Sequence, residues 1–374
     1  KNKFFDNIKG NFGFGCMRFP MKDKEVDYEE TTKMIDTFMA NGFNYFDTAH
    51  GYIGEKSEPA LRECLVKRYP RESFKLATKL PAWCMKSAED RDRIFNEQLE
   101  RAGVDYFDFY LLHSLEDGNN YNDYENYDCF NWGIEKKRQG KIKHFGFSYH
   151  GTPELLEVVL DKHPEIEFVQ IQLNYADWKN PIVYSGKLYE ILTKRNIPMI
   201  IMEPVKGGTL ANLQPELERK LKAARPEASI ASWALRFAGS LPGIITILSG
   251  MSNDEQMQDN LNTFTNFEPL SDEEKKLIDE VNKFMFNSPL IGCTACRYCC
   301  DGCPSGINIP EVFRILNTIR LYGEEWRSGN AYRGLTANSG KANDCIGCGQ
   351  CESVCPQHLS IIELLDEASK HLDK

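Results

Sequence analysis

Apolar and polar positions alternate along most of this chain in a way that predicts strands and helices in turn. Short apolar runs of strand length are followed by longer stretches whose apolar residues recur three and four positions apart. The predicted strands cover residues 13–19, 43–49, 74–79, 109–113, 144–148, 168–175, 198–205 and 244–249. The predicted helices cover 28–41, 58–67, 87–101, 132–139 and 271–286, with another starting near 152. This alternation favours parallel β/α units.

Eight such units in some 250 residues predict a TIM (β/α)8 barrel, an α/β fold with catalytic groups at the carboxyl ends of its strands. The polar segment 115–128, rich in Asn, Asp and Tyr, is expected to be a loop on that catalytic side. Helical spacing returns at 309–322 and 361–372. A chain of 374 residues therefore divides into a predicted barrel, 1–288, and a small, mainly helical domain, 289–374.

Composition narrows the function. A net charge of −10 argues against nucleic acid or an anionic membrane as the main partner. No apolar run reaches the length of a membrane span, and the N-terminus lacks the apolar region of a signal peptide. Nine of the 13 cysteines lie between Cys293 and Cys355, which indicates metal binding in a reducing compartment rather than disulfides. We therefore expect a cytoplasmic protein.

Four polar side chains stand at or just behind the ends of predicted strands: Asp47, Tyr52, Lys79 and His113. A phenol with a pKa near ~10 is a poor acid at neutral pH. It becomes useful when a cation lowers its pKa and a carboxylate holds that cation. Because the carboxyl ends of parallel strands meet at one face of a barrel, we expect these four side chains to meet there.

The residues around these four resemble the aldo-keto reductase family from about residue 12 to about residue 260. The matching motifs are Asp-Thr-Ala-x-x-Tyr at 47–52, Ser-Glu at 57–58, Ala-Thr-Lys at 77–79 and Leu-Leu-His at 111–113. The resemblance implies an oxidoreductase that reduces a carbonyl, or oxidises an alcohol, with a nicotinamide cofactor. Tyr52 would protonate the carbonyl oxygen, Lys79 held by Asp47 would lower the phenol pKa, and His113 would orient the carbonyl.

The same resemblance implies a cofactor site. Its residues are Ser148, Gln170 and Asn174 for the nicotinamide, Pro204, Lys206 and Gly207 for the pyrophosphate, and Ser252, Gln256 and Asn260 for the adenosine. Met202 stands where many members carry an aromatic that stacks on nicotinamide. Gly250 and Gln256 stand where NADP-preferring members carry Lys and Arg, so we expect NAD(H) over NADP(H).

The C-terminal cysteines form the run Cys-x2-Cys-x2-Cys-x3-Cys-Pro twice, starting at Cys293 and at Cys345. This run resembles that of bacterial two-cluster ferredoxins, in which the fourth cysteine ligates the other cluster. The resemblance implies two [4Fe–4S] clusters. Their ligand sets would be Cys293, Cys296, Cys299 and Cys355, and Cys345, Cys348, Cys351 and Cys303. A zinc site is the alternative, although zinc ligands usually come as two pairs across a longer gap. Cys300 leaves open which of two adjacent thiols ligates.

The two resemblances imply two different kinds of redox chemistry. Clusters move one electron at a time, whereas nicotinamide moves a hydride, and no separate flavin domain is evident. The clusters could serve a redox partner protein, reduce a bound substrate stepwise or be structural, or the barrel could bind flavin. A pure electron-transfer protein and a non-catalytic binding subunit are the rival functions. Trp83 and the 115–128 segment could wall an apolar substrate pocket, although Trp83 could equally be a packing residue.

Overall fold

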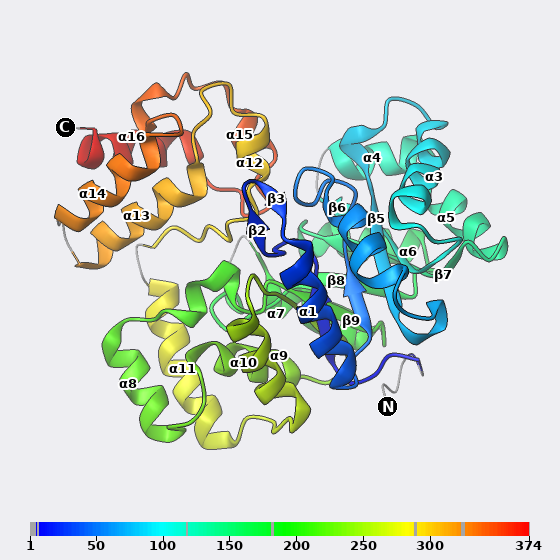
Figure 1. The fold of residues 1–374 in the computed structure, drawn as a ribbon, viewed down its shortest axis with the longest axis horizontal. Coiled ribbons are helices and arrows are strands. Elements are labelled where there is room, and N and C mark those ends of the chain that lie inside the picture. The colour runs from blue at the N-terminus through cyan, green and yellow to red at the C-terminus, as the bar shows by residue number, and fades with distance from the viewer. Residues whose placement is uncertain are drawn as a thin grey trace.

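Eight parallel strands close into a barrel in the computed structural model, which describes residues 5, 7–116, 119–180, 183–287, 290–322 and 326–373 (Figure 1). The strands follow one another around the barrel in sequence order, and the last pairs with the first. They are β1 (Phe12–Gly15), β4 (Tyr45–Asp47), β5 (Lys75–Pro81), β6 (Phe107–Leu115), β7 (Ile142–Tyr149), β8 (Phe168–Gln172), β9 (Met199–Met202) and β10 (Ile244–Gly250). A two-stranded antiparallel hairpin, β2 (Met21–Lys22) and β3 (Glu25–Val26), follows β1. The predicted TIM barrel is confirmed.

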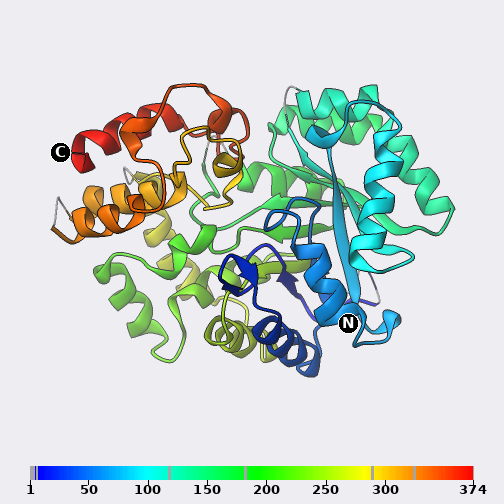
Figure 2. The same cartoon turned by 45° about the horizontal axis from the view of Figure 1, so that its top comes forward.

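Helices surround the barrel, as the turned view in Figure 2 also shows. They are α1 (Tyr28–Ala40), α2 (Ser57–Leu61), α3 (Asp90–Ala102), α4 (Asn119–Asn126), α5 (Cys129–Arg138), α6 (Pro153–Lys162), α7 (Ser185–Lys194), α8 (Pro215–Ala224), α9 (Ile230–Gly239), α10 (Asp254–Thr265) and α11 (Asp272–Asn287). The α11 helix begins with a reciprocal cap in which Ser271 Oγ accepts from Glu274 N and Ser271 N donates to a Glu274 carboxylate oxygen.

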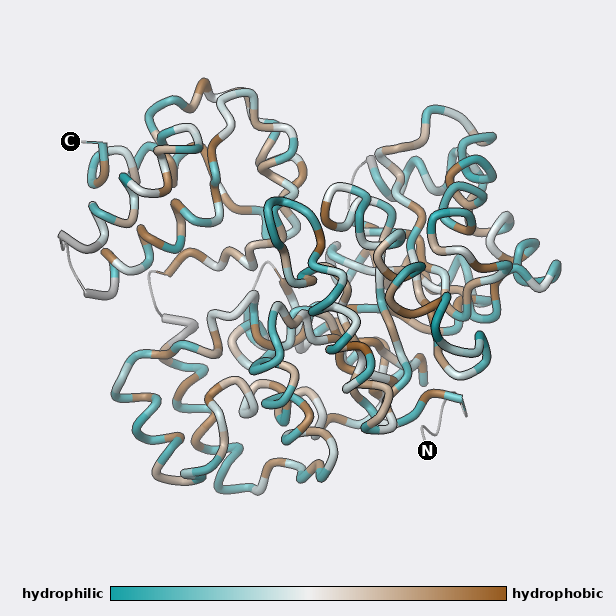
Figure 3. The backbone as a smooth tube through the Cα atoms, viewed as in Figure 1, coloured by the Kyte–Doolittle hydropathy of each residue, from teal (hydrophilic) through white to brown (hydrophobic). Residues whose placement is uncertain are grey.

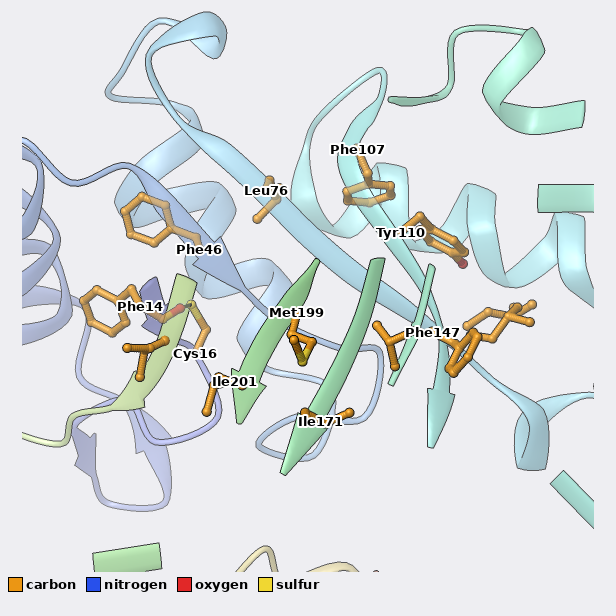
Figure 4. Close-up of a cluster of buried hydrophobic side chains, with 14 of the residues drawn as sticks. Phe14, Cys16, Phe46, Leu76, Phe107, Tyr110, Phe147, Ile171, Met199 and Ile201 are labelled. Carbon is orange, nitrogen blue, oxygen red and sulfur yellow. Dashed lines mark hydrogen bonds between the residues drawn. The ribbon is translucent and has the colours of Figure 1, made fainter. Parts of the chain in front are cut away.

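Alternation along each strand decides which side chains face the inside of the barrel. Tyr45 and Phe109 belong to the apolar cluster within the barrel. Phe46 and Tyr110, one position further on, pack in the cluster between strands and helices, part of which Figure 4 shows. Asp47 lies two residues beyond Tyr45 and therefore shares its inward face. The same parity carries Lys79 and His113 inward from β5 and β6.

The segment 115–128 differs from its prediction as a loop, because it contains α4 (Asn119–Asn126). The Tyr124 side chain is fully buried. Its hydroxyl oxygen lies 2.6 Å from the His113 carbonyl oxygen and 2.8 Å from the Leu80 carbonyl oxygen, and accepts from Ala82 N. The polar composition of the segment did not predict this helix. Hydrogen bonds from buried Tyr124 connect the helix to the ends of β5 and β6. Tyr124 is therefore committed to the core and cannot wall a substrate pocket.

The C-terminal part forms a second, helical body with its own apolar cluster, at the upper left of Figure 1. Its helices are α12 (Tyr298–Asp301), α13 (Ile309–Tyr322), α14 (Trp326–Thr336), α15 (Gln350–Ser353) and α16 (Ile361–Leu372). The helices predicted at 309–322 and 361–372 are thereby confirmed. The predicted boundary between residues 288 and 289 lies outside the described residues.

Apolar positions concentrate along the barrel strands, while polar positions are frequent along the surrounding helices, as the tube in Figure 3 shows. Among the described residues, no helix combines the length and apolar character needed to cross a membrane.

Candidate active site

The four predicted catalytic side chains come together at the carboxyl end of the barrel. Asp47 ends β4, Lys79 lies two residues before the end of β5, and His113 lies two residues before the end of β6. Tyr52 follows in the loop after β4 and is 8% exposed. Asp47, Tyr52 and His113 line one cavity of about 320 Å³. The parallel register brings together side chains that are up to 66 positions apart in the chain.

Lys79 and Asp47 form a buried ion pair. Lys79 Nζ is fully buried and lies 2.7 Å from Asp47 Oδ1, 2.6 Å from the Thr48 carbonyl oxygen and 3.4 Å from the Tyr52 hydroxyl oxygen. The ammonium also lies 4.9 Å from the centre of the Tyr52 ring. A buried charge is tolerated only with such partners, so the pair fixes a cation beside the phenol.

Burial raises the pKa of Tyr52 well above its usual value near 10, and Tyr298, Asp47 and Glu203 add to that rise. This differs from the expectation that Lys79 would make the phenol acidic before reaction. Tyr52 therefore carries its proton at neutral pH, which is the form a general acid requires. The nearby ammonium is placed to stabilise the phenolate that remains once the proton has left.

His113 is neutral in this environment. Burial lowers its pKa well below 6.5, and the neighbouring Lys79 ammonium lowers it further. His113 Nδ1 is buried and has no hydrogen-bond partner among the described residues, while Nε2 lies 3.4 Å from the Tyr298 hydroxyl oxygen. A neutral imidazole can hydrogen-bond a carbonyl oxygen without surrendering its own proton.

A buried network holds the backbone of β5 at Lys79. Gln98 Nε2 donates to the Lys79 carbonyl oxygen at 2.9 Å and to Glu58 Oε1 at 3.0 Å. Thr78 Oγ1 donates to the same Glu58 oxygen at 2.7 Å. Burial raises the pKa of Glu58 to about 7. The Ser-Glu motif at 57–58 thus supports the strand that carries the lysine.

The positions expected to hold a nicotinamide cofactor divide into two groups. Those that line the cavity are Ser148, Gln170, Pro204, Gly207, Ser252, Gln256 and Asn260. Asn174 and Lys206 are instead bound to Asp177: Asn174 Nδ2 donates to Oδ2 at 2.8 Å, and Lys206 Nζ lies 2.5 Å from Oδ1. The sequence placed Lys206 beside glycines and suggested a phosphate-binding role. It did not reveal that the Asp177 carboxylate pairs with this lysine.

Gln170 provides a test of whether a nicotinamide fits. Its Oε1 is buried and finds no hydrogen-bond partner in the part of the chain that the structure describes, although the residue lines the cavity. An orphaned buried acceptor is costly unless a ligand satisfies it, and a carboxamide NH2 is a suitable donor. Ser148 Oγ lies on the same wall and accepts from Ser114 N at 2.7 Å. The residues present therefore fit a carboxamide.

Several residues of the cavity wall were not singled out from the sequence: Arg18, Glu203, Thr294, Tyr298 and Gln357. Three of them belong to the C-terminal body, and no motif of the barrel points to them. Tyr298 lies between two cysteines of the first run, where spacing draws attention only to the thiols. Trp83 does not line this cavity; it is 52% exposed, with its ring 5.0 Å from that of His113.

The eight cysteines of the two runs surround two small cavities. One is lined by Cys293, Cys296, Cys299 and Cys355, and the other by Cys303, Cys345, Cys348 and Cys351. Each cavity thus takes three thiols from one run and the fourth from the other. Cys300 lines neither. In the described parts of the chain, no three His, Cys, Asp or Glu side chains converge as ligands of a single ion would.

Comparison with known proteins identifies both parts. The model of the aldo/keto reductase family matches residues 11–283. The chain belongs to the aldo/keto reductase family. A second model, described as a 4Fe-4S dicluster domain, matches residues 292–360. This aldo/keto reductase is therefore an oxidoreductase that carries a C-terminal iron–sulfur domain.

Curated relatives of the reductase part include L-galactose dehydrogenase of Arabidopsis thaliana, 27% identical, with 71% of this chain and 87% of the relative covered. The uncharacterized oxidoreductase YqkF of Bacillus subtilis is 24% identical, with 72% and 92% covered. Similar solved structures include an aldo-keto reductase from Klebsiella pneumoniae in complex with NADPH, at 18% identity and a TM-score of 0.59, with 73% and 90% covered. Another, from Bacillus halodurans, is 22% identical with a TM-score of 0.58 and coverage of 72% and 91%. These structural likenesses concern the fold.

Proposed function

We propose that this protein reduces a small-molecule carbonyl, or oxidises the corresponding alcohol, with a nicotinamide cofactor. The observation that carries the proposal is the buried Lys79–Asp47 pair, whose ammonium lies 3.4 Å from the Tyr52 hydroxyl at the wall of the cavity. The test is anaerobic purification, followed by spectrophotometric assay of NADH and NADPH oxidation with a panel of aldehydes and ketones. Absence of turnover across the panel in both directions would remove this function.

In this mechanism the chain orients the carbonyl and supplies a proton. Bound with its carboxamide against Ser148 and Gln170, the nicotinamide would supply the hydride. Tyr52 protonates the carbonyl oxygen as charge develops there, and Lys79 stabilises the phenolate left behind. Neutral His113 donates a hydrogen bond that polarises the carbonyl. In alcohol oxidation the same groups act in reverse, with the phenolate as base.

The pH dependence of kcat/KM should show whether His113 is neutral in the working enzyme. Because burial lowers the pKa of His113 and raises that of Tyr52, neither group changes charge between about pH 6 and pH 9. We therefore expect His113 and Tyr52 to add no inflection to kcat/KM for carbonyl reduction over this interval, and kcat/KM to fall at alkaline pH as Tyr52 loses its proton. An inflection near pH 7 that persists in His113→Asn would come from Glu58, whose pKa burial raises to about 7. An inflection near ~6.5 that disappears in His113→Asn would show that His113 titrates in the working enzyme.

We propose NAD(H) as the preferred cofactor. Gln256 at the adenosine end of the cavity is uncharged, and the Asp259 carboxylate nearby would repel a 2′-phosphate. Arg18 also lines the cavity, but its Nη2 donates to the Thr294 carbonyl oxygen at 2.7 Å. We expect NADH to bind at least ~10-fold more tightly than NADPH.

A single substitution should shift this preference. Gln256→Arg places a guanidinium at the exposed end of the cavity, where it can pair with a 2′-phosphate. We expect the Kd for NADPH to fall by about 10-fold and the Kd for NADH to change by less than about twofold, as measured by cofactor fluorescence. Gln258→Arg is the matched control, because Gln258 is exposed on the same helix but does not line the cavity. Tighter NADPH binding in the control alone would contradict the assignment.

We further propose that the two cysteine sets hold two [4Fe–4S] clusters in a cytoplasmic protein, where thiols remain reduced. The support is that each cavity is lined by four thiols drawn from both runs. Anaerobic protein should contain about eight iron and eight sulfide per chain. A zinc content of two per chain without sulfide would overturn this assignment.

A second function follows from the position of Cys296, which lines the same cavity as Tyr52. Cys296 also lines the first of the two cysteine cavities. A cluster bound by that cysteine set would supply one-electron transfer next to a ligand in the reductase cavity. Such a protein would take electrons from a redox partner, with flavin or substrate as the acceptor in the barrel and no nicotinamide chemistry. Extraction of flavin from the purified protein, together with no binding of NADH or NADPH, would favour this function over carbonyl reduction by hydride.

A further inference from the structure

The iron–sulfur domain contributes a phenol to the reductase cavity. Tyr298 begins α12 and lies between Cys296 and Cys299, yet its side chain lines the same cavity as Asp47 and Tyr52. Its hydroxyl oxygen lies 3.4 Å from His113 Nε2, and the two ring centres are 6.3 Å apart at 76°. Tyr298 therefore reaches from one domain into the catalytic groups of the other.

The hydroxyl of Tyr298 also lies close to Tyr52. Tyr298 contributes to the raised pKa of Tyr52, and the two hydroxyls share a hydrogen bond. A tyrosine hydroxyl with a pKa near ~10 carries its proton at neutral pH, so Tyr298 can donate a hydrogen bond. Its contact with His113 is long for a hydrogen bond. A substrate carbonyl bound by Tyr52 and His113 would replace both contacts of the Tyr298 hydroxyl, which would then donate to another acceptor on the ligand.

The backbone around Cys296 holds Tyr298 in this place. Ala295 and Arg297 have φ angles of +53° and +70°, in the left-handed region that ordinary residues rarely adopt. Cys293, Cys296 and Cys299, which flank these two residues, line one cavity. Ligation of Cys296 and Cys299 would therefore fix the two residues between them, Arg297 and Tyr298.

Contacts between the two bodies hold the loop from the outside. Arg18 Nη2 donates to the Thr294 carbonyl oxygen at 2.7 Å. Gln172 and Gln357 exchange two side-chain hydrogen bonds of 3.0 and 2.7 Å. At Gly207 a Cβ would lie 2.2 Å from the Thr294 carbonyl oxygen, so the two backbones touch. These contacts therefore fix the position of the segment that carries Tyr298 into the cavity.

Counting hydrogen bonds then indicates what Tyr298 binds. A carbonyl oxygen has two lone pairs, and in the proposed mechanism Tyr52 and His113 use both. The Tyr298 hydroxyl is a third donor beside that oxygen. It can therefore donate to a second oxygen, carried by the neighbouring atom of the substrate. A site built to hydrogen-bond such an oxygen discriminates against analogues that lack it, because its own polar group is then left unpaired.

We propose that Tyr298 positions the substrate, and that the substrates are carbonyl compounds with a second oxygen on the adjacent carbon, such as hydroxyaldehydes, hydroxyketones or dicarbonyls. This inference rests on the proposed carbonyl reduction. The reaction would remain a two-electron reduction, in which a bound nicotinamide would supply a hydride to the carbonyl carbon and Tyr52 would supply the proton to the oxygen. Tyr298 donates a hydrogen bond throughout and does not lose its proton.

The test compares glyceraldehyde with propanal, which lacks the neighbouring hydroxyl, in anaerobic cluster-loaded protein. Wild-type KM should be about 10-fold lower for glyceraldehyde. Tyr298→Phe, which removes only the hydroxyl, should raise the glyceraldehyde KM by about 3- to 10-fold, with kcat and the propanal KM within about twofold. Calorimetric titration of glyceraldehyde into the complex with oxidised nicotinamide should show the same loss of affinity. Cluster absorbance and nicotinamide Kd should be unchanged.

Tyr189→Phe is the matched control, because the Tyr189 hydroxyl donates to the Pro242 carbonyl oxygen outside the cavity. It should leave both KM values unchanged. Equal effects of Tyr298→Phe on both aldehydes, no effect on either, or faster turnover of both would overturn the role of Tyr298 while leaving carbonyl reduction intact. If the wild-type protein reduces neither aldehyde nor any other carbonyl with NADH or NADPH, the proposed function fails, and this inference fails with it.

Discussion

Replacing Tyr52 by Phe should lower kcat for carbonyl reduction by about 10²- to 10⁴-fold, the usual contribution of a positioned general acid. The substitution removes the one hydroxyl that lies 3.4 Å from Lys79 Nζ and keeps the aromatic ring beside the ammonium. Because Tyr52 donates a proton rather than binding the cofactor, the Kd for NADH should stay within about twofold. Stopped-flow measurement of a single turnover separates the chemical step from product release.

The control for Tyr52→Phe is again Tyr189→Phe, which also removes one phenolic hydroxyl from the barrel but at its outer surface. It should retain full activity. Turnover of the Tyr52→Phe variant within about threefold of wild type would show that another group supplies the proton. Glu203 lines the same cavity, and burial raises the pKa of its carboxyl, so Glu203→Gln is the next variant in that event.

Replacing Lys79 by Met should destabilise the protein by about 3–5 kcal/mol, as expected when one member of a buried ion pair is removed. The substitution leaves the Asp47 carboxylate buried, and its Oδ2 already has no hydrogen-bond partner among the described residues. Asp47 must then take up a proton or remain as an uncompensated charge. Urea denaturation of cluster-loaded protein at neutral pH measures the loss as a lower midpoint.

A double substitution isolates the electrostatic cause. Asp47→Leu combined with Lys79→Met removes both charges, and replacing a buried pair by apolar side chains is often nearly neutral. We expect the double variant to recover most of the stability lost in Lys79→Met, while neither variant reduces carbonyls. Equal destabilisation of the single and double variants would show that packing around the Lys79 side chain, rather than its charge, is the important contribution.

The iron–sulfur domain also contributes residues to the reductase cavity. Thr294, Cys296, Tyr298 and Gln357 form part of the wall of the reductase cavity. Substitutions in the cysteine runs are therefore expected to affect the carbonyl site even if no electron passes between the clusters and the substrate. Nicotinamide affinity and cluster absorbance should accordingly be measured with every such variant.

Several features of this protein were determined by local sequence alone. Short apolar runs alternating with helically spaced segments predicted the eight-stranded barrel, because a strand buried on both faces reads as a continuous apolar run. The motifs at 47–52, 77–79 and 111–113 indicated four side chains that the structure brings together, since the parallel register carries strand ends to one face. The cysteine runs indicated the iron–sulfur domain because thiolates that share a cubane must be closely spaced along the chain.

Other features depended on contacts between distant segments, which no local pattern encodes. Lys206 was expected beside the pyrophosphate, but Asp177, 29 residues earlier, binds its ammonium. Burial raises the pKa of Tyr52, and Tyr298 of the second domain, Asp47 and Glu203 raise it further. Tyr298 reaches His113 across 185 positions of the chain. Such contacts arise only when the chain folds, within the barrel for Lys206 and Asp177 and between the two domains for Tyr298 and His113, so only the tertiary structure could decide them.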